Sequence, residues 1–263
     1  MNHKLYQVDA FSREPFKGNP AAVCLLAQAE PDEWLQSLAT EMNLSETAFL
    51  LENKTGWNLR WFTPTTEVDL CGHATLASAK VLFETRPELR ESPIRFQTRS
   101  GELAARWQDG KVELDFPVMR YQPTPIGLDV ADVLGFQPVK AVFSGGYYLF
   151  EAEDPQLIRD AKPNMAELAK LPMPEVIITA KSGEPSYDFI SRFFAPQLGI
   201  PEDPVTGSAH CLLTPYWAER LGKLEFTAFQ ASVRGGELVL QLVEDRVIII
   251  GEAKLIFTAT LWV

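Results

Sequence analysis

The sequence contains few of the residues that build covalent or metal-linked frameworks. Its 263 residues include only three cysteines and three histidines. Cys24, Cys71 and Cys211 have neither the even count of a disulfide framework nor the close pairing of a zinc site. Because the histidines are not spaced as ligands either, we expect no disulfide framework and no bound metal.

Positive charge and long apolar segments are also scarce. Lysine and arginine number 24 against 35 aspartates and glutamates, which gives a formal net charge of −11. A field of that sign repels phosphate backbones and anionic membrane surfaces, so neither nucleic acid nor a membrane is expected as a partner. The longest aliphatic run, residues 247–250, is far too short to cross a bilayer, and residues 1–7 lack the apolar run of a signal peptide. We therefore expect a soluble, cytoplasmic protein.

Sequence motifs for nucleotide binding are absent as well. Neither G-x-G-x-x-G nor a P-loop occurs, and strands do not alternate regularly with helices as in a doubly wound parallel sheet. Nucleotide binding is therefore disfavoured.

What the chain does contain is a pair of matching blocks. RWFTP at 60–64 leads to CGHA at 71–74, and RFFAP at 192–196 leads to TGSA at 206–209. Gly72 and Gly207 lie 135 positions apart, close to half of the chain, and an apolar helical pattern follows each. We infer a duplicated fold with lobes at 1–118 and 119–263, where the final strand can return to the first lobe. Two similar lobes meeting face to face would leave one cleft, lined by two helix N-termini.

Hydrophobic periodicity predicts the same order of elements after each of these glycines. Helical spacing runs to about residue 83 in the first half and to about residue 221 in the second. Three short strands follow each helix, with turns expected at 100–101, 109–110, 234–236 and 244–245. Ahead of the first helix, strands are expected at 4–11, 21–27, 47–51 and 57–62, with a helix from about residue 31. The pattern predicts an α+β fold in which each half curls an antiparallel sheet around its own central helix.

Glu46 is the first candidate for chemistry. It stands in the segment LSETAFLL at 44–51, where a carboxylate at the mouth of an apolar strand would be partly desolvated. Desolvation raises the pKa of a carboxyl group toward neutrality and lets it act as both base and acid. The alternative is a solvated glutamate at the start of a strand.

His73 is the second candidate. It follows Gly72 at the expected start of a helix, where the macrodipole penalises a positive charge. We expect a neutral imidazole that donates or accepts one hydrogen bond, and Gly72 would let a ligand approach the backbone. The alternative is a capping histidine or a satisfied histidine of the core.

The segment EDPVTGSA at 202–209 offers a binding site for an anion. Free N–H groups at the helix start, with the hydroxyls of Thr206 and Ser208, would receive a substrate carboxylate. Asp203 could hold an amine or hydroxyl of the same molecule. The alternative is an acidic turn followed by a Ser/Thr helix cap, which does not explain the match to residues 71–74.

Cys71 raises a rival chemistry. Duplicated epimerases can use two thiols, one from each half, to remove and return a proton on opposite faces of a carbon. When the blocks are aligned on their glycines, the partner of Cys71 is Thr206, and Cys211 lies about one helical turn farther in. A thiol pair is therefore poorly supported, and neutral buried thiols are expected for Cys211 and Cys24.

Taken together, these blocks resemble the PhzF-like family, which is named for phenazine biosynthesis. The resemblance covers nearly the whole chain in order and rests on GNPAAV at 18–23, ETAF at 46–49, RWFTP at 60–64, EVDLCGHATLA at 67–77 and EDPVTGSAH at 202–210. It implies a diaminopimelate-epimerase type of fold with two pseudo-symmetric lobes, and a homodimer. It also implies an isomerase that moves a proton between carbons without a cofactor.

The resemblance further implies which residues act. In the characterised phenazine enzyme a glutamate moves the proton, helped by a histidine, an aspartate and a serine. By motif these are Glu46, His73, Asp203 and Ser208 in this chain. At the two helix N-termini, Gly72, Ala74, Thr206 and Gly207 are expected to bind the substrate.

The expected function is a cofactor-independent isomerase that acts on a small, cyclic or acyclic carboxylate by glutamate acid/base catalysis. Two alternatives stay open from the sequence. One is an epimerase or racemase that depends on Cys71, and the other is a binding protein that has kept the fold without catalysis.

Overall fold

The computed structural model describes residues 3–127 and 130–262. The described residues form two compact units, one within 1–116 and 248–263 and the other within 117–247. The sequence expectation ended the second lobe at residue 263 and allowed the final strand to return. In the structure that strand, β18 (Ala253–Thr260), is antiparallel to β1 (Lys4–Ala10) in the first unit. Among the described residues, no helix has the length and apolar character needed to cross a membrane.

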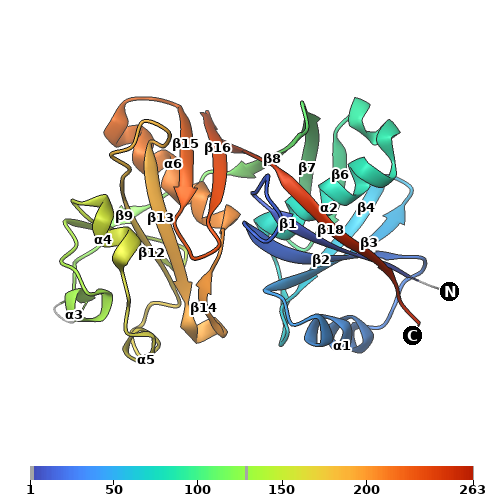
Figure 1. Cartoon of the computed structure of the whole chain (residues 1–263), viewed down its shortest axis with the longest axis horizontal. Coiled ribbons are helices and arrows are strands. Elements are labelled where there is room, and N and C mark those ends of the chain that lie inside the picture. Colours follow the sequence, from blue (N-terminus) through green and yellow to red (C-terminus); the bar gives the residue numbers. More distant parts are fainter. Residues whose placement is uncertain (1–2, 128–129, 263) are drawn as a thin grey trace. The chain divides into compact units, whose positions relative to one another are not determined.

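The first unit is a curled, mainly antiparallel sheet around one helix (Figure 1). Its further strands are β2 (Asn19–Leu26), β3 (Glu46–Asn53), β4 (Gly56–Phe62), β5 (Glu67–Val68), β6 (Ile94–Thr98), β7 (Gly101–Gln108) and β8 (Lys111–Pro117). Neighbouring strands pair antiparallel except β2 with β3 and β4 with β6, which are parallel. The helices are α1 (Asp32–Met42) and α2 (Gly72–Thr85), with a 3-10 helix at Pro87–Glu91.

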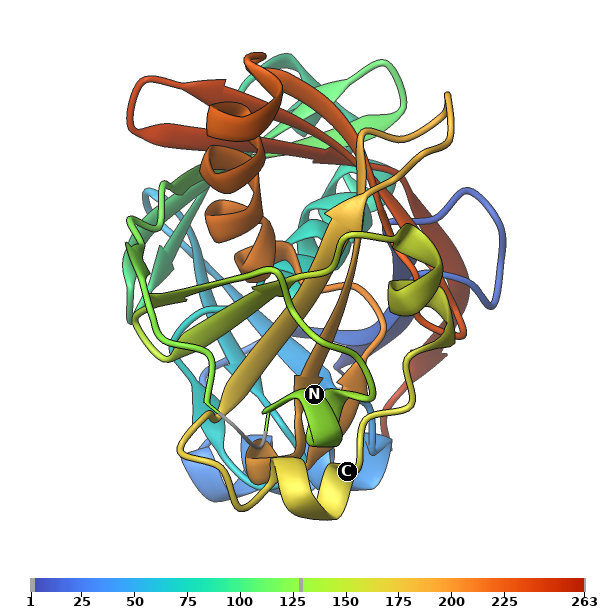
Figure 2. The same ribbon diagram turned by 90° about the vertical axis from the view of Figure 1, so that its left-hand side faces the viewer.

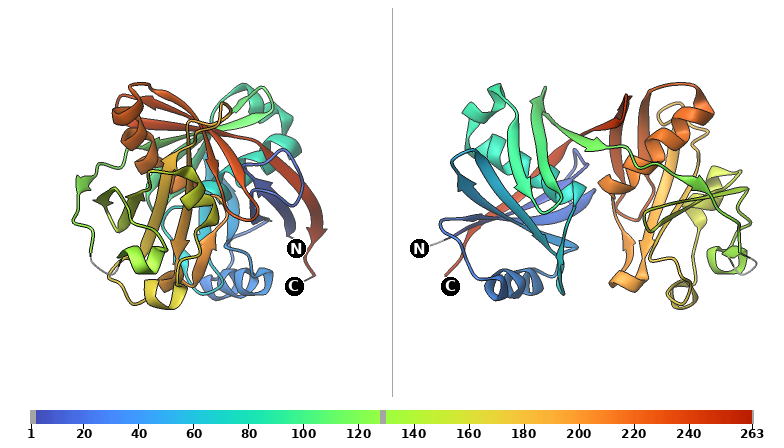
Figure 3. Two further views of the ribbon diagram at one scale, coloured as in Figure 1. Left: turned by 60° about the vertical axis from the view of Figure 1, so that its left-hand side comes forward. Right: turned by 180° about the vertical axis from the view of Figure 1, so that it is seen from behind.

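Helix α2 is the core of the first unit. It contacts strands β1, β2, β3, β7 and β18, and nearly all of its residues are buried (Figure 3, right). A helix that is apolar all round can only be stable when other elements cover every face. Helix α1, by contrast, buries only Leu35 and Ala39 and packs on β3 and β4 from outside. The sheet thus holds the start of α2 next to the start of β3.

A close backbone approach fixes the strand beside β3. Gly18, just before β2, has a φ of 66°, and a Cβ there would lie 2.1 Å from the carbonyl oxygen of Ala10. Only glycine fits such a position. The resulting register places Ala21 of β2 opposite Glu46 of β3.

The second unit repeats the plan of the first. Its strands are β9 (Gln122–Pro123), β10 (Lys140–Ser144), β11 (Tyr147–Glu151), β12 (Glu175–Lys181), β13 (Phe189–Ala195), β14 (Ile200–Asp203), β15 (Glu225–Gln230) and β16 (Gly236–Val243). The helices are α3 (Val130–Leu134), α4 (Pro155–Asp160), α5 (Met165–Leu168) and α6 (Gly207–Leu221), with a 3-10 helix at Pro196–Leu198. Among the described pairings, β11 with β12 and β13 with β15 are parallel, and they correspond to β2 with β3 and β4 with β6. Strand β17 (Arg246–Gly251) spans the change from the second unit back to the first.

Helix α6 is the central helix of the second unit (Figure 2). Trp217 stacks on Phe189 of β13, and its indole N–H donates to the hydroxyl of Thr179 on β12 at 3.1 Å. Pro215 interrupts the helical hydrogen bonds because proline has no N–H to donate to Cys211. The backbone N–H of Met119 donates to that freed carbonyl at 3.0 Å, so the helix continues without an orphaned acceptor.

The predicted fold class is confirmed, and so is the order of one helix followed by three strands in each half. The two helices begin at Gly72 and Gly207, as expected. The hairpin turn at 109–110 has positive φ at both residues, 48° and 91°, which suits the Asp-Gly pair. The sheets differ from the expectation in containing parallel pairs and further strands, among them β10, β11 and β12.

Candidate active site

Glu46 is the first residue of β3 in the first unit. The side chains of Thr47 to Leu50 behind it are buried, and the side chain of Glu46 itself is only 12% exposed. The carboxylate therefore stands at the mouth of an apolar strand and is largely withdrawn from water.

His73 faces this carboxylate from the first turn of α2. Its Nε2 lies 3.2 Å from Oε2 of Glu46, although the two atoms do not meet the geometry of a hydrogen bond. The imidazole is 3% exposed, and burial lowers the pKa of His73 to about 3. The ring is therefore neutral at physiological pH and carries one proton on one of its two nitrogens.

Cys71 contacts the other edge of the same ring. Its Sγ lies 3.5 Å from Nδ1 of His73, and the thiol is buried at the N-cap of α2. Glu46, Cys71 and His73 thus place a carboxylate oxygen, a sulfur and an imidazole nitrogen within 4.8 Å of one another. That donor set suits zinc, but the thiol and the carboxylate contact opposite nitrogens of one ring, and a ring binds one ion through one nitrogen. The expectation that no metal binds stays a prediction.

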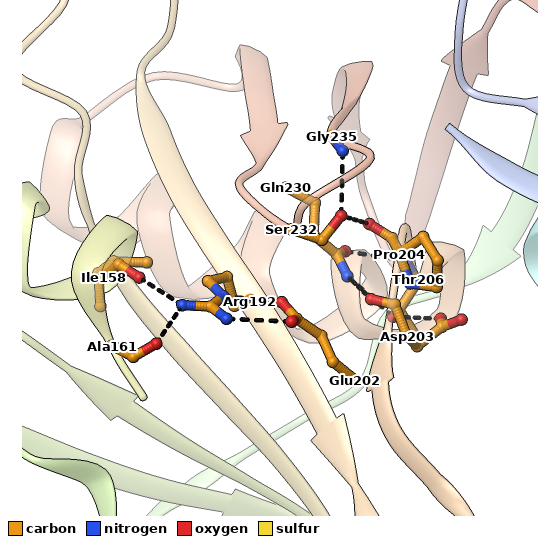
Figure 4. Close-up of polar contacts among 10 residues, drawn as sticks. All are labelled: Ile158, Ala161, Arg192, Glu202, Asp203, Pro204, Thr206, Gln230, Ser232 and Gly235. Atoms are coloured by element: carbon orange, nitrogen blue, oxygen red, sulfur yellow. Dashed lines mark hydrogen bonds and ion pairs between the residues drawn. The ribbon is translucent and has the colours of Figure 1, made fainter. Parts of the chain in front are cut away.

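Asp203 and Thr206 form a buried network in the second unit (Figure 4). Asp203 ends β14, and its Oδ2 accepts a hydrogen bond from the Thr206 hydroxyl at 2.5 Å. Gln230 of β15 ties the loop down: its amide donates to the Asp203 carbonyl at 2.8 Å and accepts from the Thr206 N–H at 2.8 Å. Ser232 adds a bond to the Pro204 carbonyl. A loop held at so many points keeps Asp203 in one place.

Ser208 is the second residue of α6 and is half-buried. The phenol of Tyr147, on β11, donates to its Oγ at 3.1 Å. Burial and the nearby Glu175 raise the pKa of Tyr147, so the phenol keeps its proton. Burial also raises the pKa of Glu175. Because the Tyr147 phenol donates a hydrogen bond to Ser208 Oγ, the Ser208 hydroxyl can donate its own hydrogen bond to a bound anion.

The starts of α2 and α6 offer backbone N–H groups that have no acceptor within their helices. Gly72 and Ala74 lie in the first turn of α2, and Gly207 lies in the first turn of α6. The first N–H groups of a helix have no acceptor within it, and neither N-cap residue, Cys71 or Thr206, caps its helix with its side chain. These backbone donors can bind a carboxylate.

The structure also contains a duplicated ion pair that the sequence analysis missed. Arg60 of β4 binds both oxygens of Glu67 at 2.7 and 2.6 Å, and Arg192 of β13 binds both oxygens of Glu202 at 2.7 and 3.0 Å. Each glutamate stands five positions before the glycine that starts its helix. The signal was present, because both arginines open the matching blocks. Each pair fastens the segment that leads into a helix start (Figure 4 for Arg192).

Within each unit the predicted residues therefore form a local cluster. In the first unit Glu46 and His73 are in contact beside Gly72, and in the second unit Asp203 contacts Thr206 at the start of α6. Tyr147 and Gln230 were not predicted, since neither belongs to a motif and each reaches its partner across many residues. A separate cavity of about 600 Å³, lined by residues 117–121 and by Pro215, contains none of the predicted residues.

The family follows from comparison with known proteins. A family profile described as phenazine biosynthesis-like protein matches residues 8–259. The chain belongs to the PhzF-like family. A protein named "uncharacterized isomerase" from Halalkalibacterium halodurans is 48% identical over 262 residues, which cover 99% of each chain. Three bacterial relatives, which are 47–48% identical to this chain, are named uncharacterized isomerases. The chain is therefore an enzyme of the isomerase class.

Solved structures agree with the family. A PhzF-family protein from Enterococcus faecalis is 42% identical, covers 100% of both chains and superposes with a TM-score of 0.95. A hydroxyproline epimerase from Agrobacterium vitis matches 98% of this chain and 92% of its own with a TM-score of 0.63 at 12% identity, and so shares the fold alone. The predicted diaminopimelate-epimerase type of fold is thereby confirmed for the PhzF-like chain.

Proposed function

We propose that this PhzF-like protein moves a proton between two carbons of a small carboxylate, with Glu46 as the acid and base and without a cofactor. The observation that carries the proposal is the contact of the withdrawn Glu46 carboxylate with the neutral, buried ring of His73. A carboxylate that contacts a neutral imidazole is not paired with a cation there, so it can accept a proton from the substrate.

The proposed step balances in protons and electrons. Glu46 removes a proton from a carbon next to an electron-withdrawing group, so that a C–H bond breaks, an O–H bond forms and the electron pair spreads over the conjugated substrate. The Glu46 carboxyl group then delivers a proton to a different carbon, and nothing is oxidised or reduced. Exchange of the carboxyl proton with solvent between the two steps carries deuterium into the product. His73 would polarise or help to reprotonate the extended electron system. A positioned acid/base group of this kind contributes about 10²- to 10⁴-fold in rate.

The second unit would supply binding. We propose that Asp203 and Ser208 orient the substrate, and that the N–H groups near Gly72, Ala74, Thr206 and Gly207 receive its carboxylate. The Asp203 carboxylate, which is held in place by Thr206, is suited to bind an amine or a hydroxyl group. The Ser208 hydroxyl, which accepts a hydrogen bond from Tyr147, is suited to bind an anion.

Chemistry by a thiol pair has less support. The repeat places Thr206 opposite Cys71. Burial raises the pKa of Cys211 to about 12, and burial together with Glu30 raises the pKa of Cys24 to about 12. Neither thiol would ionise at neutral pH, so no second thiolate is offered for a two-base epimerase.

The proposal includes a homodimer in the cytoplasm, on the strength of the family resemblance. Light scattering of the purified protein would test whether it is a homodimer. Fractionation of cells would test whether it is cytoplasmic.

The substrate class can be tested without a product assay. Wild-type protein is incubated in deuterated water with a panel of small cyclic and acyclic carboxylates, and NMR follows both isomerised products and deuterium on carbon. We expect one structural class to change. The proposal would be contradicted if no carboxylate of the panel, conjugated or unconjugated, gave an isomerised product or gained deuterium on carbon.

A further inference from the structure

Cys71 stands at the N-cap of α2 but does not cap the helix. Its side chain makes no bond to the first-turn N–H groups, and its Sγ lies 3.5 Å from Nδ1 of His73. Cysteine is not among the side chains that cap helices well, which are Ser, Thr, Asp and Asn. The Cys71 side chain is therefore directed toward the imidazole ring of His73 rather than toward the backbone N–H groups of α2.

The corresponding residue of the second unit behaves in the same way. Thr206 is the N-cap of α6, makes no side-chain cap, and donates its hydroxyl proton to Asp203 at 2.5 Å. Threonine is a good capping residue, so the absence of a cap there is informative. In both repeats the N-cap side chain bonds to a residue proposed to act on substrate.

The contacts of His73 on its two edges favour one tautomer. A neutral imidazole has one N–H, on Nδ1 or on Nε2. A thiol donating to Nδ1 requires the ring proton on Nε2. The charge of the Glu46 carboxylate, 3.2 Å from Nε2, also favours a proton there, although the pair is not aligned as a hydrogen bond. Both neighbours thus favour the Nε2–H form while Glu46 is ionised.

The two neighbours differ once Glu46 has taken a proton. A neutral carboxyl group can donate from Oε2 to Nε2, and His73 could then switch to the Nδ1–H form. After that switch, the proton taken from the substrate would lie on Oε2 of Glu46, the oxygen that faces His73. A thiol that continues to donate to Nδ1 opposes the switch, so that Oε2 remains an acceptor and the mobile proton stays on Oε1.

We propose that Cys71 is a positioning residue whose thiol keeps His73 in the Nε2–H tautomer while Glu46 gains and returns its proton. The catalytic part of this inference rests on the proposed function. The tautomer itself is a property of the free protein, and its measurement needs neither substrate nor turnover.

Two variants separate this role from a purely structural one. Cys71→Ala removes the donor, and Cys71→Ser restores a donor of similar size. Nitrogen-15 NMR of ring-labelled histidine reports which nitrogen carries the proton, and His73→Asn identifies the signals of His73 by their loss. We expect Nε2–H alone in the wild type and in Cys71→Ser, and a mixture with Nδ1–H in Cys71→Ala.

Turnover gives the second readout. We expect kcat to fall about tenfold in Cys71→Ala with KM nearly unchanged, and to stay within about threefold of the wild type in Cys71→Ser. A wild-type His73 protonated on Nδ1, or an unchanged Nε2–H form in Cys71→Ala, would overturn the inference. Equal and complete loss of turnover in both variants would instead assign Cys71 to the thiol chemistry of an epimerase.

Failure of the proposed function gives a different pattern. If Glu46 plays no part in proton transfer, Glu46→Gln stays active while the tautomer result is unaffected.

Discussion

Aligned on Gly72 and Gly207, the two units keep the same Arg–Glu pair and differ at the positions that carry chemistry. Cys71 corresponds to Thr206, and His73 corresponds to Ser208. The first unit thus presents a carboxylate and an imidazole, and the second presents hydroxyls beside a fixed carboxylate. The duplicated part is therefore the ion pair that supports each helix start, while the side chains proposed for proton transfer and those proposed for substrate binding belong to different units.

The two Arg–Glu pairs differ in the burial of the arginine and in its further partners. Arg192 is buried and donates to the carbonyls of Ile158 and Ala161 as well as to Glu202. The side chain of Arg60 is 30% exposed, and its additional partner, Asp32, lies in solvent. Glu67 and Asp32 raise the pKa of Arg60, which stays charged in either case.

The largest expected effect sharpens this inequality. Arg192→Met should lower the free energy of unfolding by about 3–5 kcal/mol, because it leaves Glu202 and two carbonyls without their cation. Arg60→Met should cost only about 1 kcal/mol, because Arg99 still contacts the buried Glu67 and because Asp32 lies in solvent. Urea unfolding followed by circular dichroism measures both. Equal losses would show that the two pairs are equivalent in energy.

His73 and His210, which are both buried, give a smaller, pH-dependent effect on stability. Burial lowers the pKa of His73 to about 3 and that of His210 to about 4. The unfolded chain, with ordinary histidine pKa values near 6.5, binds more protons than the folded one in the range between. The free energy of unfolding should therefore fall as the pH falls below about 6.5, with a slope approaching about 1.4 kcal/mol per pH unit for each histidine.

A matched pair of variants divides this dependence between the units. From pH 7 to pH 5.5 the wild type should lose on the order of 2 kcal/mol, and His73→Asn or His210→Asn should each lose about half of that. The free energies come from urea unfolding at each pH. A variant with the full wild-type dependence would show that its histidine is not held neutral by the fold.

The smallest effect concerns the binding role of the second unit. Ser208→Ala should raise KM about tenfold while kcat changes little, because a hydrogen bond to the substrate is made before and during the reaction. Tyr147→Phe should have a weaker effect, about threefold, since Ser208 remains and only its donor is lost. Steady-state kinetics separate the two constants. A drop in kcat with unchanged KM for Ser208→Ala would move this residue into the proton-transfer step.

Much of the fold could be predicted because it depends on local patterns. The helices at Gly72 and Gly207 follow from apolar periodicity, and the 109–110 turn follows from the Asp-Gly pair. The strands between residues 140 and 181 were not predicted. Their side chains are buried without a clear period of two, as in β12, where Val176 to Ala180 are all buried.

The sites were predictable to the extent that they lie in motifs. Glu46 and His73 could be named from their segments, but their contact depends on β2 aligning β3 next to α2. Tyr147 reaches Ser208 across 61 positions, and Gln230 reaches Thr206 across 24. Pairings of that length arise from sheet topology, which no local pattern encodes.

The most direct test of the account compares Glu46→Gln with the wild type on a carboxylate that the wild type converts. NMR in deuterated water follows isomerisation and deuterium on carbon together, and a binding titration checks that the ligand is still held. The account predicts a loss of about 10²- to 10⁴-fold in both signals with an unchanged fold and near-normal affinity. Turnover of Glu46→Gln at the wild-type rate would contradict it.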